Sequence, residues 1–353
     1  MTPAGRDDAP AVLAVDGGNS KADAVLATLT GRVLGAARWI GPANVSRGFE
    51  ALEPLGEAVR AARAQAGLVD SDGHVARVGV FCLAGADFPV DEERLERALD
   101  REGWAKRTVV RNDTFAVLRA GTDRGWGVAV VCGAGMNCIG VDPRGRTVRF
   151  PALGALSGDF AAGGEWAGLR ALGAALRARD GRGPRTALEE AIPAHFGMAR
   201  PETVMNAIHR GRLSRDRLVE LPPTVFQEAM SGDAVARTLL DQVAEEVVAM
   251  ATAAIRRLRL AATDVDVVLG GGMFRSGDDA FAARVVRGIH RVAPRANVRE
   301  LTGPPVLGAG LLGLDEIGAS KAASERLRRS LDHATVERSE NRSTSMRPGD
   351  RRT

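Results

Sequence analysis

The sequence of 353 residues contains no tyrosine, and aromatic residues of every kind make up only 4% of it. Its net charge of +4 and its pI near 9.5 would suit a protein that binds nucleic acid. However, residues 321–353 hold nine Lys or Arg against five Asp or Glu, which accounts for the whole excess. The remainder is electrically balanced and offers few rings on which bases can stack. Composition therefore predicts no nucleic-acid partner.

Cysteine is also scarce. Cys82, Cys132 and Cys138 lie inside apolar runs and form no C-x-x-C pair, and the five histidines show no ligand spacing. These features indicate buried free thiols in a reducing compartment rather than disulfides or a zinc site. The sequence shows no signal peptide at its start and no apolar run long enough for a membrane helix. We therefore expect a cytoplasmic protein with no membrane partner.

Two common enzyme signatures are absent. No G-x-S-x-G sequence points to a hydrolase, and the GxxxxGK[ST] spacing of a Walker A loop does not occur. The composition of the sequence is ordinary for a globular protein, with 45% hydrophobic and 26% charged residues. A chain of this length is expected to form two domains.

The apolar pattern predicts one series of elements twice. In each half, three strands are joined first by a glycine turn and then by a tight turn, and helices follow. Such a repeat predicts a duplicated α/β unit with two lobes facing a shared cleft. The strands that open the two halves are predicted at 11–16, 22–29 and 33–40, and at 126–132, 136–141 and 146–150. Further strands are predicted at 75–83, 107–111, 265–269 and 297–301, and helices at 50–66, 91–102, 114–120, within 165–260, at 281–292 and at 306–317.

These elements divide the chain into five parts. Beyond residue 318 the composition turns to Ser, Arg, Glu and Thr, so the end of the chain is predicted to be a disordered tail with at most a marginal helix at 322–331. The parts are a leader at 1–10, an N-terminal α/β lobe at 11–120, a C-terminal α/β lobe with helical insertions at 121–305, a terminal helix at 306–318 expected to pack back on the first lobe, and the tail at 319–353.

Three glycine-rich turns are candidates for nucleotide contacts. Glycines at a strand end let backbone N–H groups approach an anion or a flat adenine closely, and Asp16 can hold Mg²⁺ through its waters. Each turn alone also has an ordinary explanation, as a hairpin or a strand-to-helix connection, but the first two stand at equivalent places in the two halves. The predicted ATP-binding residues are Gly17, Gly18, Asn19, Ser20 and Lys21, then Gly133, Ala134 and Gly135, and finally Gly271 and Gly272.

Two aspartates are candidates for the chemistry of an acceptor hydroxyl. Asp113 follows a predicted strand, and in open α/β sheets the carboxyl ends of strands border the ligand crevice. A carboxylate there can take the proton of an attacking hydroxyl during phosphoryl transfer. Asp159 lies in a glycine-rich loop that leads into a long helix. For both, a helix N-cap is the ordinary alternative, and for Asn44, in the loop after a third strand, the alternative is turn formation.

Taken in order, these motifs resemble the N-acetylglucosamine kinases of the BadF/BadG/BcrA/BcrD ATPase family, in the actin/hexokinase superfamily. The resemblance covers roughly residues 11–318. It implies a duplicated ribonuclease-H-like α/β fold around a central ATP cleft, with Mg²⁺ bound together with ATP and a small sugar as the second substrate. The motifs that carry it are 15–23 and 133–137 for phosphate, 112–113 for catalysis, 158–159 for the sugar and 269–273 for adenosine.

The same resemblance implies roles for single residues. Asp113 would be the general base for the 6-hydroxyl of N-acetylglucosamine or a related hexosamine. Asp16 would hold the metal. The residues that would line the sugar pocket with Asp113 are Asn44, Gly85, Gly158 and Asp159.

The sequence departs from the family pattern at four positions. Ala134 and Met136 replace hydroxyl residues of the second phosphate turn, so that turn would bind phosphate through backbone amides alone. Leu153 and Phe160 stand where relatives carry Trp and Glu beside the sugar loop. These changes bear on which sugar is used more than on kinase activity, and the sequence leaves the sugar open.

Other functions fit parts of the pattern. An ATP-driven activator of acyl-CoA dehydratases, from the same family, would need cysteines exposed for an iron–sulfur cluster, whereas the cysteines here lie in predicted buried strands. A catalytically silent sugar sensor would not need Asp16 and Asp113. Sugar kinases of the ROK type carry a zinc-binding cysteine cluster that is missing here. The long helices predicted in the second half would suit the interface of a homodimer.

Overall fold

The computed structural model describes residues 9–45, 52–68, 73–337 and 340–342. The chain folds as two units, Met1–Asp123 together with Thr302–Thr353, and Arg124–Leu301. Most of the predicted leader and the start of the helix predicted at 50–66 lie outside the described residues. Within the described ranges, no helix is long and apolar enough to cross a membrane.

Both units contain the same sheet. The order is β3-β2-β1-β4-β5 in unit 1, where β11 extends the sheet beyond β3, and β8-β7-β6-β9-β10 in unit 2. In unit 1, β3, β2 and β1 pair antiparallel, and β4 and β5 run parallel to β1. In unit 2, β8, β7 and β6 pair antiparallel, and β9 and β10 run parallel to β6. The duplicated α/β fold predicted from the repeated turns is therefore confirmed. The strands are β1 (Pro10–Gly17), β2 (Lys21–Thr28), β3 (Val33–Ile40), β4 (Val78–Leu83), β5 (Thr108–Asn112), β6 (Gly127–Cys132), β7 (Met136–Val141), β8 (Thr147–Arg149), β9 (Asp266–Gly270), β10 (Asn297–Glu300) and β11 (Glu340–Arg342).

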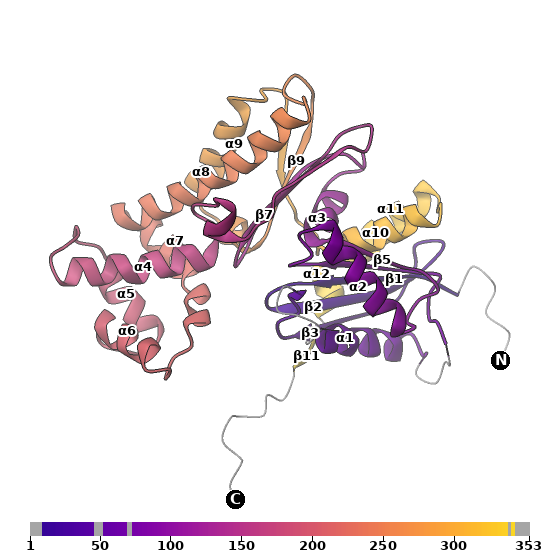
Figure 1. Ribbon diagram of the computed structural model, residues 1–353, viewed down its shortest axis with the longest axis horizontal. Helices are drawn as coiled ribbons and strands as arrows, with labels where there is room; N and C mark the ends of the chain where they lie inside the picture. The colour runs from indigo at the N-terminus through magenta and orange to yellow at the C-terminus, as the bar shows by residue number, and fades with distance from the viewer. Residues whose placement is uncertain (1–8, 46–51, 69–72, 338–339, 343–353) are drawn as a thin grey trace, which may run out of the picture. The chain divides into compact units, whose positions relative to one another are not determined.

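Unit 1 has almost continuously apolar strands because helices cover both faces of its sheet. In β1, seven of the eight residues are buried. Figure 1 shows α1 on one side of the sheet and α10 on the other, and the buried side chains agree with this arrangement. The first face packs against α1 (Leu52–Gln65) and α2 (Pro89–Arg101), and the second against α3 (Asp113–Gly121) and α10 (Val306–Glu316).

The contact between α10 and α3 depends on a glycine. A Cβ atom added to Gly308 would lie 1.8 Å from the carbonyl oxygen of Ala116, so any side chain there forces the helices apart. We expect Gly308→Ala to lower the free energy of unfolding by about 1–3 kcal/mol. Urea unfolding measures the change.

Gly173 is the matched control. It lies inside α4 (Gly164–Arg179), and an added Cβ would meet no atom within 4 Å among the described residues. Gly173→Ala is therefore expected to stabilise the protein by about 0.5–1 kcal/mol through helix propensity. Destabilisation by both variants would contradict the packing explanation.

Unit 2 is built around α8 (Ala234–Arg257). Asp233 caps this helix, its carboxylate accepting the N–H of Ala236 at 2.8 Å. The buried face of α8 packs against the sheet and the neighbouring helices in one continuous core. Figure 1 shows the shorter helices gathered near one end of α8. They are α5 (Leu188–His195), α6 (Pro201–His209) and α7 (Pro222–Met230), with α4 beside them and α9 (Asp279–His290) packed along α8.

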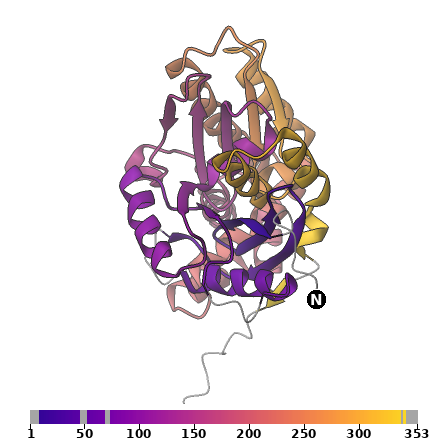
Figure 2. The ribbon, with the colours of Figure 1, turned by 90° about the vertical axis from the view of Figure 1, so that its right-hand side faces the viewer.

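The prediction of a disordered tail from residue 319 is wrong for most of the described end of the chain, although the marginal helix allowed at 322–331 corresponds to one of its helices. That segment forms α11 (Lys321–Ser330), α12 (His333–Glu337) and β11, which pairs in parallel with β3. Ala323, Leu327 and Leu331 are buried against unit 1, and Figure 2 shows this yellow segment beside the indigo strands. The composition is polar on average, but one apolar residue per helical turn is enough to bury one face.

Candidate active site

Three acidic residues follow the parallel strands of unit 1. Asp16 lies near the end of β1, Asp87 in the loop after β4, and Asp113 directly after β5. In the sheet Asp16 stands opposite Cys82, and Leu83 opposite Asn112, so the three strand ends meet at one edge. In open α/β sheets this carboxyl edge borders the ligand site. The structure thus brings together Asp16 and Asp113, which the sequence placed far apart.

The surroundings of Asp113 and Asp16 favour their neutral forms. Burial raises the pKa of Asp113 to about 7, and the negative charges of Asp16 and Asp87 add to that effect. Burial also raises the pKa of Asp16 to about 7, against the opposing charge of Lys21. A carboxyl group with a pKa near 7 is well matched to taking a proton at neutral pH.

Asn112, not Asp113, caps α3. Its side-chain oxygen accepts the N–H of Thr114 at 3.1 Å and the Thr114 hydroxyl at 2.5 Å. Its side-chain nitrogen donates to Asp87 at 2.9 Å, and its backbone N–H donates to Glu92 at 2.9 Å. The ordinary explanation of Asp113 as an N-cap is therefore wrong, and Asp113 is the first residue of the helix.

The first glycine turn is a hairpin between β1 and β2. The Gly18 N–H donates to the Lys21 carbonyl at 2.9 Å, while Asn19 and Ser20 are exposed at the tip. Gly17 is required for packing as well, since an added Cβ would lie 2.8 Å from Leu83. The turn is therefore a hairpin, and this conformation is compatible with the predicted binding of phosphate.

Lys21 does not stand free beside this turn. Its ammonium pairs with Asp23, a fully buried carboxylate that also receives two hydrogen bonds from Arg38, at 2.7 and 3.0 Å. Asp23 pairs across the sheet with Asp16 on β1 and with Arg38 on β3. Lys21 therefore belongs to a buried ion-pair network next to Asp16, in addition to its predicted place near phosphate.

The predicted sugar residues of unit 1 lie in loops at the same edge. The Asn44 side chain donates to Asn19 of the hairpin at 2.7 Å. The Val45 N–H donates to the Ala84 carbonyl at 3.0 Å, which ties this loop to the one that contains Gly85. Gly85 has a φ of 88°, a conformation that favours glycine. The structure thus places Asn44 and Gly85 around the strand ends that hold Asp16 and Asp113.

In unit 2, the second and third glycine turns meet. Gly271 lies so close to β6 that an added Cβ would be 2.3 Å from the Cys132 carbonyl oxygen. The Gly133 and Ala134 carbonyls accept the first N–H groups of α4, from Gly164 and Glu165, each at 2.8 Å. The turns that contain Gly133, Ala134, Gly135, Gly271 and Gly272 therefore share the carboxyl edge of β6 and β9.

The second turn itself, Gly133 to Asn137, contains no hydroxyl side chain. Met136 is buried in β7, so its thioether belongs to the core. Phe160, by contrast, is 58% exposed and its ring lies 5.9 Å from that of Trp166. Leu153 is exposed as well. The positions that depart from the family pattern next to the sugar loop thus present apolar surface.

Asp159 has a neighbour that the sequence did not reveal. Its carboxylate accepts the Ser157 hydroxyl at 2.6 Å, and Gly158 has a φ of 85° that turns the loop. Glu246, from α8, has a raised pKa because of burial, opposed by the Phe160 N–H and reinforced by the charge of Asp159. A second carboxylate thus stands near the predicted sugar loop, and no local motif could have indicated it because it comes from a distant helix.

Other polar partners of the site were also missed from sequence. Asp87 and Glu92 accept hydrogen bonds from Asn112, and Arg38 donates to Asp23. The available signal was a charged residue inside an apolar strand, at both Asp23 and Arg38. Oppositely charged residues at such places are expected to pair.

The residues fit Mg²⁺ held chiefly by a nucleotide. Among the described residues, no group of three His, Cys, Asp or Glu side chains could hold a metal ion by itself. Mg²⁺ keeps several waters and commonly uses one or two carboxylates besides substrate phosphates. Asp16, near a hairpin turn whose tip is exposed, suits that demand.

Comparison with known proteins agrees with this class of site. The model of the BadF/BadG/BcrA/BcrD ATPase family matches residues 13–313. The chain belongs to this family.

Curated relatives are sugar kinases. The chain is 27% identical over 269 residues to the N-acetylmuramic acid/N-acetylglucosamine kinase of Clostridium acetobutylicum, covering 75% of this chain and 86% of that protein. It is 24% identical over 257 residues to the N-acetyl-D-glucosamine kinase of Dictyostelium discoideum, covering 70% and 79%. A solved Chromobacterium violaceum protein, described as a proposed N-acetylglucosamine kinase, has a TM-score of 0.69 at 23% identity, covering 87% of this chain and 99% of that one. The last likeness establishes the fold.

Proposed function

We propose that the protein is an amino-sugar kinase that transfers the γ-phosphate of ATP to the 6-hydroxyl of N-acetylglucosamine or a related hexosamine. The observation that carries this proposal is Asp113, whose pKa is about 7 and which lies at the strand edge beside Asp16. The family match and the two curated relatives support the proposal by similarity.

The proposal assigns roles to residues of both units, each taken by itself. In unit 1, Asp113 takes the proton of the attacking hydroxyl, and Asn44 and Gly85 contact the sugar. In unit 2, Asp159 accepts a hydrogen bond from a hydroxyl of the sugar. The backbone N–H groups of the glycine turns at 133–135 and 271–272 bind the nucleotide, as do those of the first turn, at 17–20 in unit 1. Phosphoryl transfer needs mainly positioning and charge stabilisation, which backbone amides supply without side-chain hydroxyls at Ala134 and Met136.

Asp16 is the residue that would hold Mg²⁺ in this site, through coordinated water. When bound, the ion neutralises charge on the phosphates. Lys21 adds a positive charge near the same turn, although its pairing with Asp23 limits how far the ammonium can reach. Backbone amides and Asp16 are therefore expected to contribute more to phosphate binding than Lys21 does.

An activator function that needs an exposed iron–sulfur cluster finds no support in the cysteines. Cys82, Cys132 and Cys138 are free thiols and all are buried. Burial raises the pKa of each thiol, which opposes the thiolate form that binds metal. The kinase proposal is therefore preferred to the activator.

ADP release with Mg·ATP tests the proposal directly. We expect N-acetylglucosamine or one of N-acetylmuramic acid, glucosamine and glucose to raise the rate far above that without sugar. The control is the same assay with Asp113→Asn protein, in which the stimulated rate should fall by at least about 10²-fold. Sugar binding without stimulated ADP release by any of the four would indicate a sensor and reject the kinase.

A further inference from the structure

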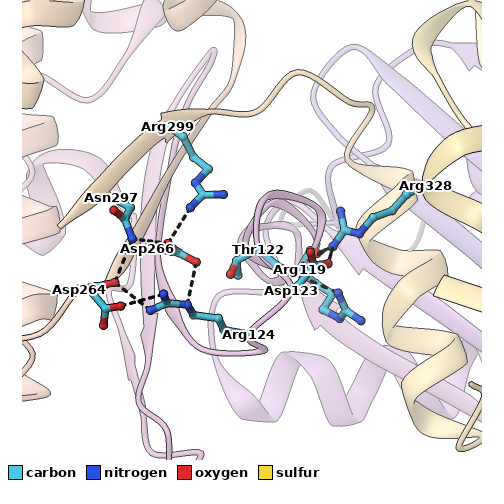
Figure 3. A network of polar contacts seen from close by, with 9 residues as sticks. All are labelled: Arg119, Thr122, Asp123, Arg124, Asp264, Asp266, Asn297, Arg299 and Arg328. Atoms are coloured by element: carbon cyan, nitrogen blue, oxygen red, sulfur yellow. Dashed lines mark hydrogen bonds and ion pairs between the residues drawn. The ribbon is translucent and has the colours of Figure 1, made fainter. Parts of the chain in front are cut away.

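The helix that begins with Asp113 is held at its other end by the C-terminal segment of the chain. Arg328, on α11, donates hydrogen bonds to three carbonyls at the end of α3, those of Ala120 at 2.5 Å, Arg119 at 2.9 Å and Thr122 at 3.2 Å. Figure 3 shows its guanidinium pointing into this helix end. The last carbonyls of a helix have no partner within it, and a cation there also interacts favourably with the helix dipole.

Two further ion pairs fasten the same region. Arg328 lies 2.9 Å from a carboxylate oxygen of Asp123, the last residue of unit 1 before the chain enters unit 2. Arg119 on α3 forms a two-pronged pair with Asp315 of α10, at 2.6 and 3.1 Å. Figure 3 shows the next residue, Arg124, paired separately with Asp264 and Asp266. The end of α3 is thus fixed by α10 and α11 together.

α11 is itself firmly seated. Leu327, one residue from Arg328, is completely buried, and Ala323 and Leu331 are nearly so. A Cβ added to Gly31, in the turn after β2, would lie 2.0 Å from the Ala323 carbonyl oxygen, so the backbone of α11 packs closely against this turn. The segment 321–342 lies beyond the region that the family model matches, which ends at residue 313.

We propose that Arg328 is a positioning residue for Asp113, acting through α3. The helix has nine residues and is fixed at its start by the Asn112 cap and at its end by Arg328. A short helix with both ends fixed cannot tilt or fray, so the Asp113 carboxylate keeps its place at the strand edge. The C-terminal segment outside the family region is therefore part of what makes the site work. This inference rests on the proposed role of Asp113 as the base.

The test compares Arg328→Met with Arg329→Met. Arg329 lies on the same helix but is exposed, so its replacement is the matched control. With N-acetylglucosamine and Mg·ATP, Arg328→Met is expected to lower kcat by roughly 10- to 100-fold with little change in the KM for ATP, since misplacement of a catalytic group by about 1 Å can cost that much. Arg329→Met is expected to keep wild-type kcat. Arg328→Lys, which keeps the charge but loses the planar fork, should recover part of the rate and guards against a Met variant that does not fold.

A double variant separates positioning from general destabilisation. If Arg328 acts through Asp113, adding Arg328→Met to Asp113→Asn should lower kcat no further. A full additional loss in the double variant, or wild-type kcat in folded Arg328→Met and Arg328→Lys, would overturn the inference. If Asp113→Asn alone kept wild-type kcat, the proposed base would be wrong, and the inference with it. Loss in Asp113→Asn with none in the Arg328 variants would leave the proposed function intact and reject only the inference.

Discussion

Asp113→Asn is expected to lower kcat by at least about 10²- to 10⁴-fold, the usual contribution of a general base. The substitution keeps the shape of the side chain but removes the group that accepts the proton of the attacking hydroxyl. ATP affinity should stay nearly unchanged, because the glycine turns that are proposed to bind the nucleotide are untouched. Stopped assays of ADP release and a nucleotide titration measure the two quantities.

The control for this variant is Asp100→Asn, the same substitution at an exposed aspartate on α2 of the same unit. It should leave kcat at the wild-type value. Wild-type turnover in Asp113→Asn would remove Asp113 from the mechanism. A loss of ATP affinity as large as the loss of kcat would instead mean that the substitution damages the whole site.

The pH dependence of wild-type activity reports the protonation of the same group, the Asp113 carboxylate. The pKa of Asp113 is raised to about 7, so the base is mostly protonated below that pH and cannot accept a proton. Activity is therefore expected to rise as the pH increases through 7 and to be lost as the pH falls. Because Asp16 has a similar pKa and interacts with Asp113, the rising limb of kcat/KM belongs to the pair. A flat profile between about pH 5 and 8, the range in which such a group titrates, would contradict the assignment.

Asp23→Asn is expected to destabilise unit 1 by about 3–5 kcal/mol. Asp23 is fully buried and is the shared partner of Arg38, whose side chain is only 8% exposed, and of Lys21. Without the carboxylate, Arg38 keeps a buried charge with its principal counter-charge removed, and charges in such a place are costly to leave uncompensated. Urea unfolding followed by circular dichroism, with the two units fitted as separate transitions, measures the loss.

A surface pair provides the comparison. Asp180 pairs with Arg182, and both side chains are largely open to solvent. Water and salt already screen such charges, so Asp180→Asn is expected to change stability very little. Equal, small effects of the two substitutions would mean that the Asp23 network contributes no more than a surface ion pair.

The repeated fold was predictable, and candidate site residues could be proposed, because both depend on local signals. Continuous apolar runs at β1 and β6 predict strands covered on both faces, and the glycines that follow them predict turns, since both are properties of neighbouring residues. Asp16 and Asp113 were identified because each directly adjoins such a strand end. The carboxyl ends of parallel strands meet at one edge whatever the rest of the chain does.

The partners of these residues were decided by the tertiary structure. Lys21 pairs with Asp23 and Arg38 because β1, β2 and β3 align in one register, and Glu246 stands near Asp159 because α8 packs beside the sugar loop. The tail was predicted as disordered, with at most a marginal helix, because its average composition is polar, whereas Leu327 and Leu331 find a surface to cover only once α10 packs on the sheet of unit 1. The periodic pattern of apolar residues determines the local backbone conformation. An ion pair or a buried side chain needs a partner from elsewhere in the chain, and only folding brings that partner close.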